Sequence, residues 1–89
     1  MSQNASEKCW EVYIIETVSG SLYTGISNNL EARFLAHQKG KGGAKFFSFS
    51  SPLKIVFRKS FANRSEASKK EAFIKKMSRK EKLDLIALQ

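Results

Sequence analysis

The sequence predicts an α+β domain, with a small, mainly antiparallel three-stranded sheet flanked by helices. Strand-forming residues alternate near the start of the chain, capping boxes mark helices further on, and the expected order is β-β-α-β-α-α without βαβ alternation. The 89 residues suffice for one domain with one core. We expect residues 1–8 to be a disordered tail and residues 9–89 to form the domain.

The opening hairpin depends on the length of its loop. Residues 10–15 and 22–26 are rich in β-forming side chains and predict two adjacent strands. Residues 18–20 end in a glycine suited to the left-handed position, which favours the common three-residue loop. In that register Tyr13 and Tyr23 are diagonal neighbours on one face of the sheet, whereas a two-residue loop would place them on opposite faces.

The first helix is expected over residues 28–38. Asn28 can cap its amino-terminal end, with Glu31 as the reciprocal partner in a capping box. Arg33 lies one turn before His37, so the two side chains are neighbours on the helix surface. Helical spacing predicts an inner side made of Leu30, Phe34 and His37.

A third strand and two further helices complete the chain. The strand is expected over residues 53–61, with Pro52 at its start and with Leu53, Ile55 and Phe57 alternating onto one face. The two helices are predicted by capping boxes: Asn63 with Glu66, and Ser78 with Glu81. The first of these helices is expected to turn inward Ala67, Phe73, Ile74 and Met77.

The charge balance favours a polyanionic partner. Lys and Arg number 16 against 8 Asp and Glu, and the resulting charge of +8 attracts polyanions over about a Debye length, of which nucleic acid is the commonest. A membrane surface is the competing partner, but no long apolar or basic amphipathic segment supports it. Because Cys9 is the only cysteine and residues 1–8 lack an apolar signal core, we expect a cytoplasmic protein.

Several residues could carry chemistry, and each also has an ordinary structural role. Glu71 lies at the border of the inward face of its helix, where a carboxylate needs a cation, a hydrogen-bond donor or a metal. Lys75, one turn later, is its simplest partner. Tyr13 and Tyr23 are typical amphipathic strand residues. Arg33 is a helix residue that is solvated by default. His37 is ordinarily a histidine at the edge of the core.

Taken together, these residues resemble the pattern of the GIY-YIG nuclease family. In chain order they are Tyr13, the triad Tyr23-Thr24-Gly25, Arg33, His37 and Glu71. The first triad, Gly-Ile-Tyr in the family, is Glu11-Val12-Tyr13 here, which keeps the tyrosine and loses the glycine. The resemblance extends from about Trp10 to Leu88. It is to small stand-alone bacterial proteins similar to the nuclease domain of the excision-repair incision enzyme and to the catalytic subunits of endonucleases that cut branched DNA.

The resemblance implies a metal-dependent endonuclease that hydrolyses phosphodiester bonds in DNA, branched or damaged DNA included, by one-step in-line attack of water. Glu71 would hold Mg²⁺ or Mn²⁺, and Arg33 would contact the phosphate as charge builds on it. Tyr13 would be the general base if neighbouring positive charge lowers its pKa, with Tyr23 as its partner. His37 titrates nearer neutrality and is an auxiliary proton carrier.

Substrate binding is expected from contacts to backbone phosphates, which are blind to sequence. Shape, or a protein partner, would then select the substrate, and RNA stays open beside DNA. One alternative is a non-catalytic basic nucleic-acid-binding module on the same fold, and another is an interaction protein that docks an acidic partner. The residues expected to contact nucleic acid are Gly25, Lys39, Lys41, Lys45, Lys69, Lys70, Lys75 and Lys76.

Overall fold

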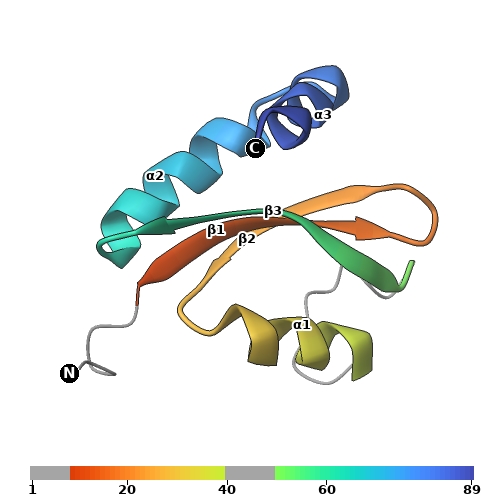
Figure 1. The fold of residues 1–89 in the computed structure, drawn as a ribbon, viewed down its shortest axis with the longest axis horizontal. Helices are drawn as coiled ribbons and strands as arrows, with labels where there is room; N and C mark the ends of the chain where they lie inside the picture. The colour runs from red at the N-terminus through yellow and green to blue at the C-terminus, as the bar shows by residue number, and fades with distance from the viewer. Residues whose placement is uncertain (1–8, 40–49) are drawn as a thin grey trace.

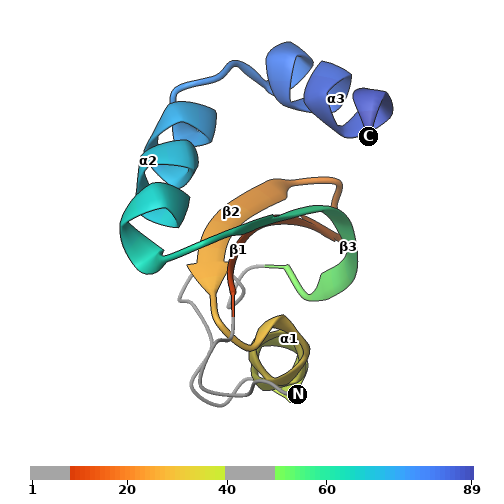
Figure 2. The same ribbon diagram turned by 60° about the vertical axis from the view of Figure 1, so that its left-hand side comes forward.

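A computed structural model describes residues 9–39 and 50–89, and the predicted α+β fold is confirmed. The elements are β1 (Trp10–Thr17), β2 (Leu22–Ser27), α1 (Leu30–Lys39), β3 (Pro52–Phe61), α2 (Arg64–Lys75) and α3 (Arg79–Leu88). The sheet has the order β2-β1-β3, and both pairings are antiparallel. α1 lies on one face of the sheet, and α2 and α3 lie on the other (Figures 1 and 2).

The hairpin between β1 and β2 has the predicted three-residue loop. Gly20 has a φ of 91°, in the left-handed region that glycine adopts without strain. The Thr17 N–H closes the loop by donating to the Ser21 carbonyl at 2.9 Å. The rings of Tyr13 and Tyr23 are 6.3 Å apart between centroids, so the predicted diagonal pair on one face is confirmed.

β1 is the central strand and buries side chains on both of its faces. Val12 and Ile14 pack against buried residues of α2, whereas Tyr13 and Ile15 pack against Leu30 of α1. The sheet therefore separates two small cores, one for each helical layer. Tyr13 belongs to the α1 side, and its position in the central strand explains its burial.

β3 departs from the predicted alternation. The register between β1 and β3 shifts twice, because the pairing skips Val56, which forms a bulge, and then Leu53. An extra residue moves the side chains beyond it to the opposite face. Phe57 therefore packs on the α2 side and Ile55 on the α1 side, while Leu53 is 51% exposed. The prediction that these three side chains share one face is wrong because it assumed a regular ladder.

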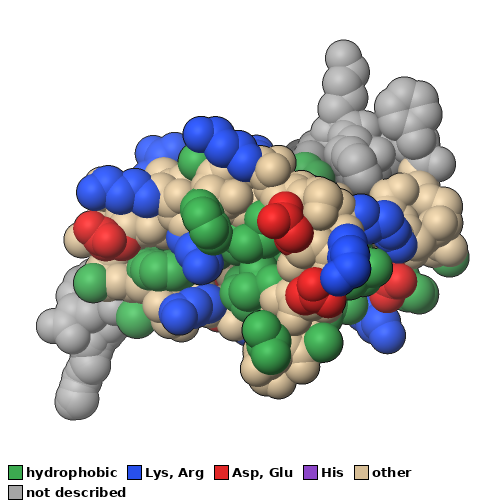
Figure 3. All heavy atoms as spheres, turned by 90° about the horizontal axis from the view of Figure 1, so that it is seen from above, with side chains coloured by type: hydrophobic (Ala, Val, Ile, Leu, Met, Phe, Trp, Pro, Cys, Tyr) green, Lys and Arg blue, Asp and Glu red, His purple; other side chains and the backbone are tan. Residues whose placement is uncertain are grey.

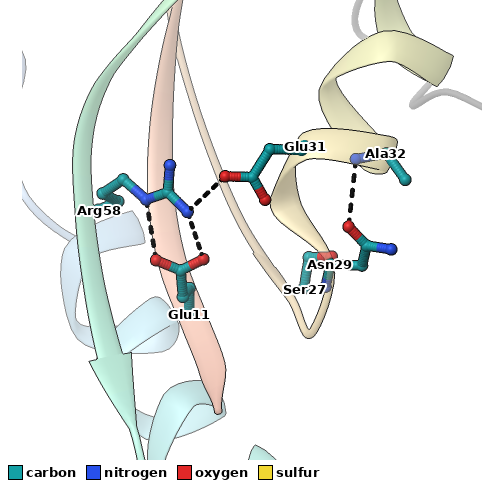
Figure 4. Close-up of polar contacts among 6 residues, drawn as sticks. All are labelled: Glu11, Ser27, Asn29, Glu31, Ala32 and Arg58. Carbon is teal, nitrogen blue, oxygen red and sulfur yellow. Dashed lines mark hydrogen bonds and ion pairs between the residues drawn. The ribbon is translucent and has the colours of Figure 1, made fainter. Parts of the chain in front are cut away.

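α1 begins two residues later than the predicted range, and its predicted capping box is wrong. The side-chain oxygen of Asn29, not Asn28, accepts from the backbone N–H three residues on, at 3.3 Å. The Asn29 N–H itself donates to Ser27 Oγ at 2.9 Å. Glu31 is drawn away by Arg58, whose guanidinium lies 3.1 Å from its carboxylate (Figure 4).

The caps of α2 and α3 lie where the sequence predicts them. Asn63 accepts from the Glu66 N–H at 2.9 Å, and Ser78 forms a complete capping box with Glu81. The expected inward face is correct for Ala67 and Ile74 of α2, and Met77, just beyond the end of the helix, packs against the same core. It is wrong for Phe73, which is 57% exposed and carries the Lys70 ammonium over its ring. No helix among the described residues is long and apolar enough to cross a membrane.

Candidate active site

A pocket of about 470 Å³ lies where the end of β2 meets α1 and α2. Four of the five predicted catalytic residues line it, and each comes from a different element. They are Tyr13 of β1, Tyr23 of β2, Arg33 of α1 and Glu71 of α2. Side chains that are far apart in the sequence are thus brought to one concave surface.

Tyr13 is 1% exposed, and its hydroxyl lies 3.5 Å from Nε2 of His37. Burial raises the pKa of Tyr13 to about 12, and the neighbouring Tyr23 phenol acts in the same direction. The Arg33 guanidinium opposes this shift but does not overcome it. In the chain alone, the lower Tyr13 pKa that a base role would require is not found, because desolvation outweighs the positive charge.

His37 lies behind the two tyrosines, outside the described residues that line the pocket. It is 2% exposed, and its ring meets Tyr23 edge-on, with 5.8 Å between centroids. Burial, and then the charge of Arg33, lower its pKa below the ordinary value of 6.5. His37 is therefore neutral at pH 7 and can accept a proton from Tyr13 in the tautomer that leaves Nε2 unprotonated.

Glu71 has the ordinary ion-pair partner and also lines the pocket. Its carboxylate lies 3.3 Å from the Lys75 ammonium, so the ordinary ion pair exists. The same side chain lines the pocket and is 22% exposed. Among the described residues no three His, Cys, Asp or Glu side chains cluster as a metal site. A single oxygen ligand suits a hard cation that keeps most of its water, as Mg²⁺ does.

Gly25 is required for the packing of the two tyrosines. A Cβ at this position would lie 2.6 Å from Tyr13 Oη and 3.1 Å from Tyr23 Cε2. Any side chain would therefore displace the Tyr13 hydroxyl from the pocket wall. The structure gives Gly25 a packing role in addition to the phosphate contact expected from the sequence.

Two pocket residues in the amino-terminal part of α2 were not among the predicted site residues. Arg64 and Ser68 line the pocket together with Glu71, and the three positions recur at helical spacing on one face. That spacing, counted backward from Glu71, could have found them. Trp10 also lines the pocket, and the Arg64 guanidinium lies 5.4 Å from the centre of its ring.

The predicted lysines are spread over several surfaces. Lys75 is connected to the pocket through its ion pair with Glu71. The Lys69 ammonium lies 3.9 Å from the Glu66 carboxylate. Lys70 lines a different hollow, between β3 and α3. On the face formed by α2 and α3, Lys and Arg side chains stand among hydrophobic and acidic ones (Figure 3). Lys39 and Lys76 are exposed at helix ends. Lys41 and Lys45 lie outside the described residues.

The chain also matches the model of a known protein family. The family described as the GIY-YIG catalytic domain matches residues 9–84, which is most of the chain. The chain belongs to the GIY-YIG family. Membership indicates a nuclease-type function, with nucleic acid as the class of substrate.

Relatives of this GIY-YIG protein cover nearly its whole length. A UPF0213 protein of Photorhabdus laumondii is 40% identical over 84 residues, covering 94% of this chain and 80% of that protein. Another from Clostridium perfringens is 46% identical over 76 residues, covering 85% and 81%. The solution NMR structure of a UPF0213 protein from Bacillus halodurans matches with a TM-score of 0.59 at 34% identity, covering 91% and 85%.

Proposed function

We propose that this GIY-YIG protein is a metal-dependent endonuclease that hydrolyses phosphodiester bonds in DNA, branched or damaged DNA included. The observation that carries the proposal is the single pocket lined by Tyr13, Tyr23, Arg33 and Glu71. Phosphate binding alone needs positive charge, whereas two phenols and a carboxylate beside a guanidinium also serve proton transfer and metal binding. RNA as a second substrate, a protein partner that supplies specificity, and a cytoplasmic location are further expectations.

Arg33 is the group that would hold the reacting phosphate. It projects into the pocket from α1, and its planar guanidinium can donate two parallel hydrogen bonds to phosphate oxygens. Negative charge on those oxygens changes as water attacks the phosphorus in line with the departing oxygen. Donors already in place stabilise that charge without reorganisation, which lowers the barrier.

Tyr13 and His37 would together remove the proton from the attacking water. Since the Tyr13 pKa is about 12, the phenol is protonated at pH 7 and cannot act alone as a strong base. In a relay, the water proton passes to Tyr13 Oη while the phenol proton passes to His37 Nε2, which lies 3.5 Å away. His37 ends positively charged and Tyr13 ends unchanged. Tyr23, whose ring is 6.3 Å from that of Tyr13, would orient the water.

Glu71 is the ligand that would hold Mg²⁺ or Mn²⁺ in this pocket, because it is the carboxylate among the described lining residues. Such an ion, when bound, supplies Lewis acidity to the phosphate and stabilises the departing oxygen. The Lys75 ammonium, 3.3 Å from the carboxylate, would release Glu71 to the ion or share it.

A non-catalytic nucleic-acid-binding module is the second candidate. The raised Tyr13 pKa and the ion pair between Glu71 and Lys75 favour it, since binding makes no use of an ionised phenol or a free carboxylate. Such a module would bind DNA in a salt-dependent way and would be indifferent to replacement of either side chain.

The proposal is tested by incubating the protein with labelled single-stranded, nicked and branched DNA and with matching RNA. We expect products with Mg²⁺ or Mn²⁺ and none with EDTA. Tyr13→Phe should abolish cleavage and leave the circular dichroism spectrum unchanged, because only the hydroxyl is removed. Full activity of Tyr13→Phe would show that Tyr13 is not on the proton path. If the wild type yields no product on any substrate, the non-catalytic binding module is the remaining candidate.

A further inference from the structure

The pocket extends beyond the place for the reacting phosphate. Its volume, about 470 Å³, lies in the range of roughly 300–1,000 Å³ that accommodates drug-sized ligands, so it has room for more than one phosphate group. The part that the proposed chemistry does not use is walled by Trp10, Arg64 and Ser68. This part, which we call the α2 wall, carries its own positive charge.

Arg64 is held in a defined position on the α2 wall. Its guanidinium lies over the face of Trp10 at 5.4 Å, a cation–π arrangement that leaves the N–H donors at the edge of the plane available. Among the described residues no carboxylate forms an ion pair with Arg64. The side chain is exposed on its other side, so an anion can reach it.

Two guanidinium groups therefore face one pocket from different helices. Arg33 comes from α1 and Arg64 from the first turn of α2, while the charge of Glu71 is already balanced by Lys75. One bidentate guanidinium is sufficient for one phosphate. A second, on another wall, is suited to a second anionic group in the same ligand.

We propose that Arg64, held on Trp10, binds the phosphate next to the scissile one in a nucleic-acid strand. The inference rests on the proposed function for the identity of the ligand as a phosphodiester chain. Ser68, one turn along the same wall, can add a hydroxyl hydrogen bond to that phosphate. The protein would accordingly prefer a strand with consecutive phosphates to an isolated phosphodiester.

The test compares ligands with one and two phosphates in EDTA, where no cleavage is required. Thymidine dinucleotide and trinucleotide, TpT and TpTpT, are titrated into the protein and followed by NMR, with UpU and UpUpU as the RNA arm. In the wild type the second phosphate should improve affinity about tenfold, the value of one charge-assisted hydrogen-bond pair. In Arg64→Met the two ligands should bind within about twofold of each other.

Arg79→Met is the matched control. Arg79 is also the first residue of its helix and is exposed, but it lines a different hollow with Ser21, Leu22 and Lys82. The two variants lose the same charge, so only Arg64→Met should lose the gain from the second phosphate. Arg64→Lys keeps the charge without the planar fork, and it should keep part of the gain, which serves as the measure if Arg64→Met does not fold.

Two results would overturn the inference: no gain from the second phosphate in the wild type, or an equal gain in Arg64→Met and Arg79→Met. If the gain depends on Arg64 while no DNA or RNA is cut with Mg²⁺ or Mn²⁺, Arg64 binds a second phosphate of the strand and the proposed function fails. If the gain is seen with TpTpT and not with UpUpU, the ligand is a DNA strand, and the reverse result assigns RNA.

Discussion

Arg58 of β3 and Arg33 of α1 have opposite electrostatic surroundings. Arg58 donates to both oxygens of Glu11, at 2.8 and 2.7 Å, and to Glu31 at 3.1 Å (Figure 4). The two carboxylates hold the Arg58 pKa above its ordinary value. Arg33 has no carboxylate within ion-pairing distance among the described residues, and it lines a pocket with Glu71 on a different wall.

The difference separates an arginine that holds the fold from one that is available to a ligand. The ion pairs of Arg58 join β1, β3 and α1, so its positive charge is satisfied inside the protein. The charge of Arg33 is directed into a hollow that an anion can enter. In a chain of net charge +8, the count of basic residues does not identify a site, whereas the pairing of each one does.

Of the two arginines, Arg33 should have the larger effect on cleavage when it is replaced. Arg33→Met should lower the single-turnover cleavage rate by about 10²–10³, the usual cost of removing a donor that stabilises transition-state charge. Its thermal midpoint should stay near that of the wild type, since no ion pair among described residues is lost. A rate within a few fold of wild type would show that Arg33 does not contact the reacting phosphate.

The paired arginine should give the opposite result. Arg58→Met leaves the half-buried Glu11 carboxylate without its bidentate partner, and we expect a loss of about 1–2 kcal/mol in the free energy of unfolding. For a domain of this size that corresponds to a fall in melting temperature of roughly 4–8 °C per kcal/mol. Cleavage per folded molecule should not change. A thermal melt and a cleavage assay on one preparation compare both quantities.

The smallest expected effect is on the pH dependence of the free energy of unfolding, which differs between the two regions. The buried His37 has a lowered pKa in the folded state, so the unfolded chain binds more protons below about pH 6.5, and stability falls as pH drops through that window. The Glu31 pKa is also lowered, by its own backbone hydrogen bond and by Arg58, and its contribution to stability is lost only below the ordinary glutamate pKa of 4.5.

Urea unfolding at pH 7.5 and pH 5.5 distinguishes these windows. His37→Gln should lose less stability than the wild type between the two pH values, while Glu31→Gln should lose as much as the wild type. Equal losses in the wild type and His37→Gln would mean that His37 is not held neutral by burial.

The sequence predicted the parts of the molecule that depend on local chemistry. Gly20 set the hairpin loop through its backbone freedom, and that loop alone placed Tyr13 and Tyr23 on one face. Ser78 and Glu81 predicted the start of α3 because a capping box needs no tertiary contact. The family pattern pointed to the four residues that the pocket brings together.

Long-range effects explain what the sequence could not predict. The bulge at Val56 arises in the pairing of β3 with β1, and Glu31 leaves its cap because Arg58 approaches from another strand. The Tyr13 pKa depends on how deeply α1 buries the ring, which no local pattern reveals. The contact of Arg64 with Trp10 joins the start of α2 to the start of β1, and no local pattern predicts it.

Single-turnover cleavage of labelled branched DNA by Glu71→Gln, beside the wild type and Glu66→Gln, tests the central claim most directly. Both glutamates lie on α2, but Glu66 pairs with Lys69, and only Glu71 lines the pocket. The account predicts that Glu71→Gln yields no product at any Mg²⁺ or Mn²⁺ concentration, while Glu66→Gln cuts like the wild type. Wild-type cleavage by Glu71→Gln would contradict it.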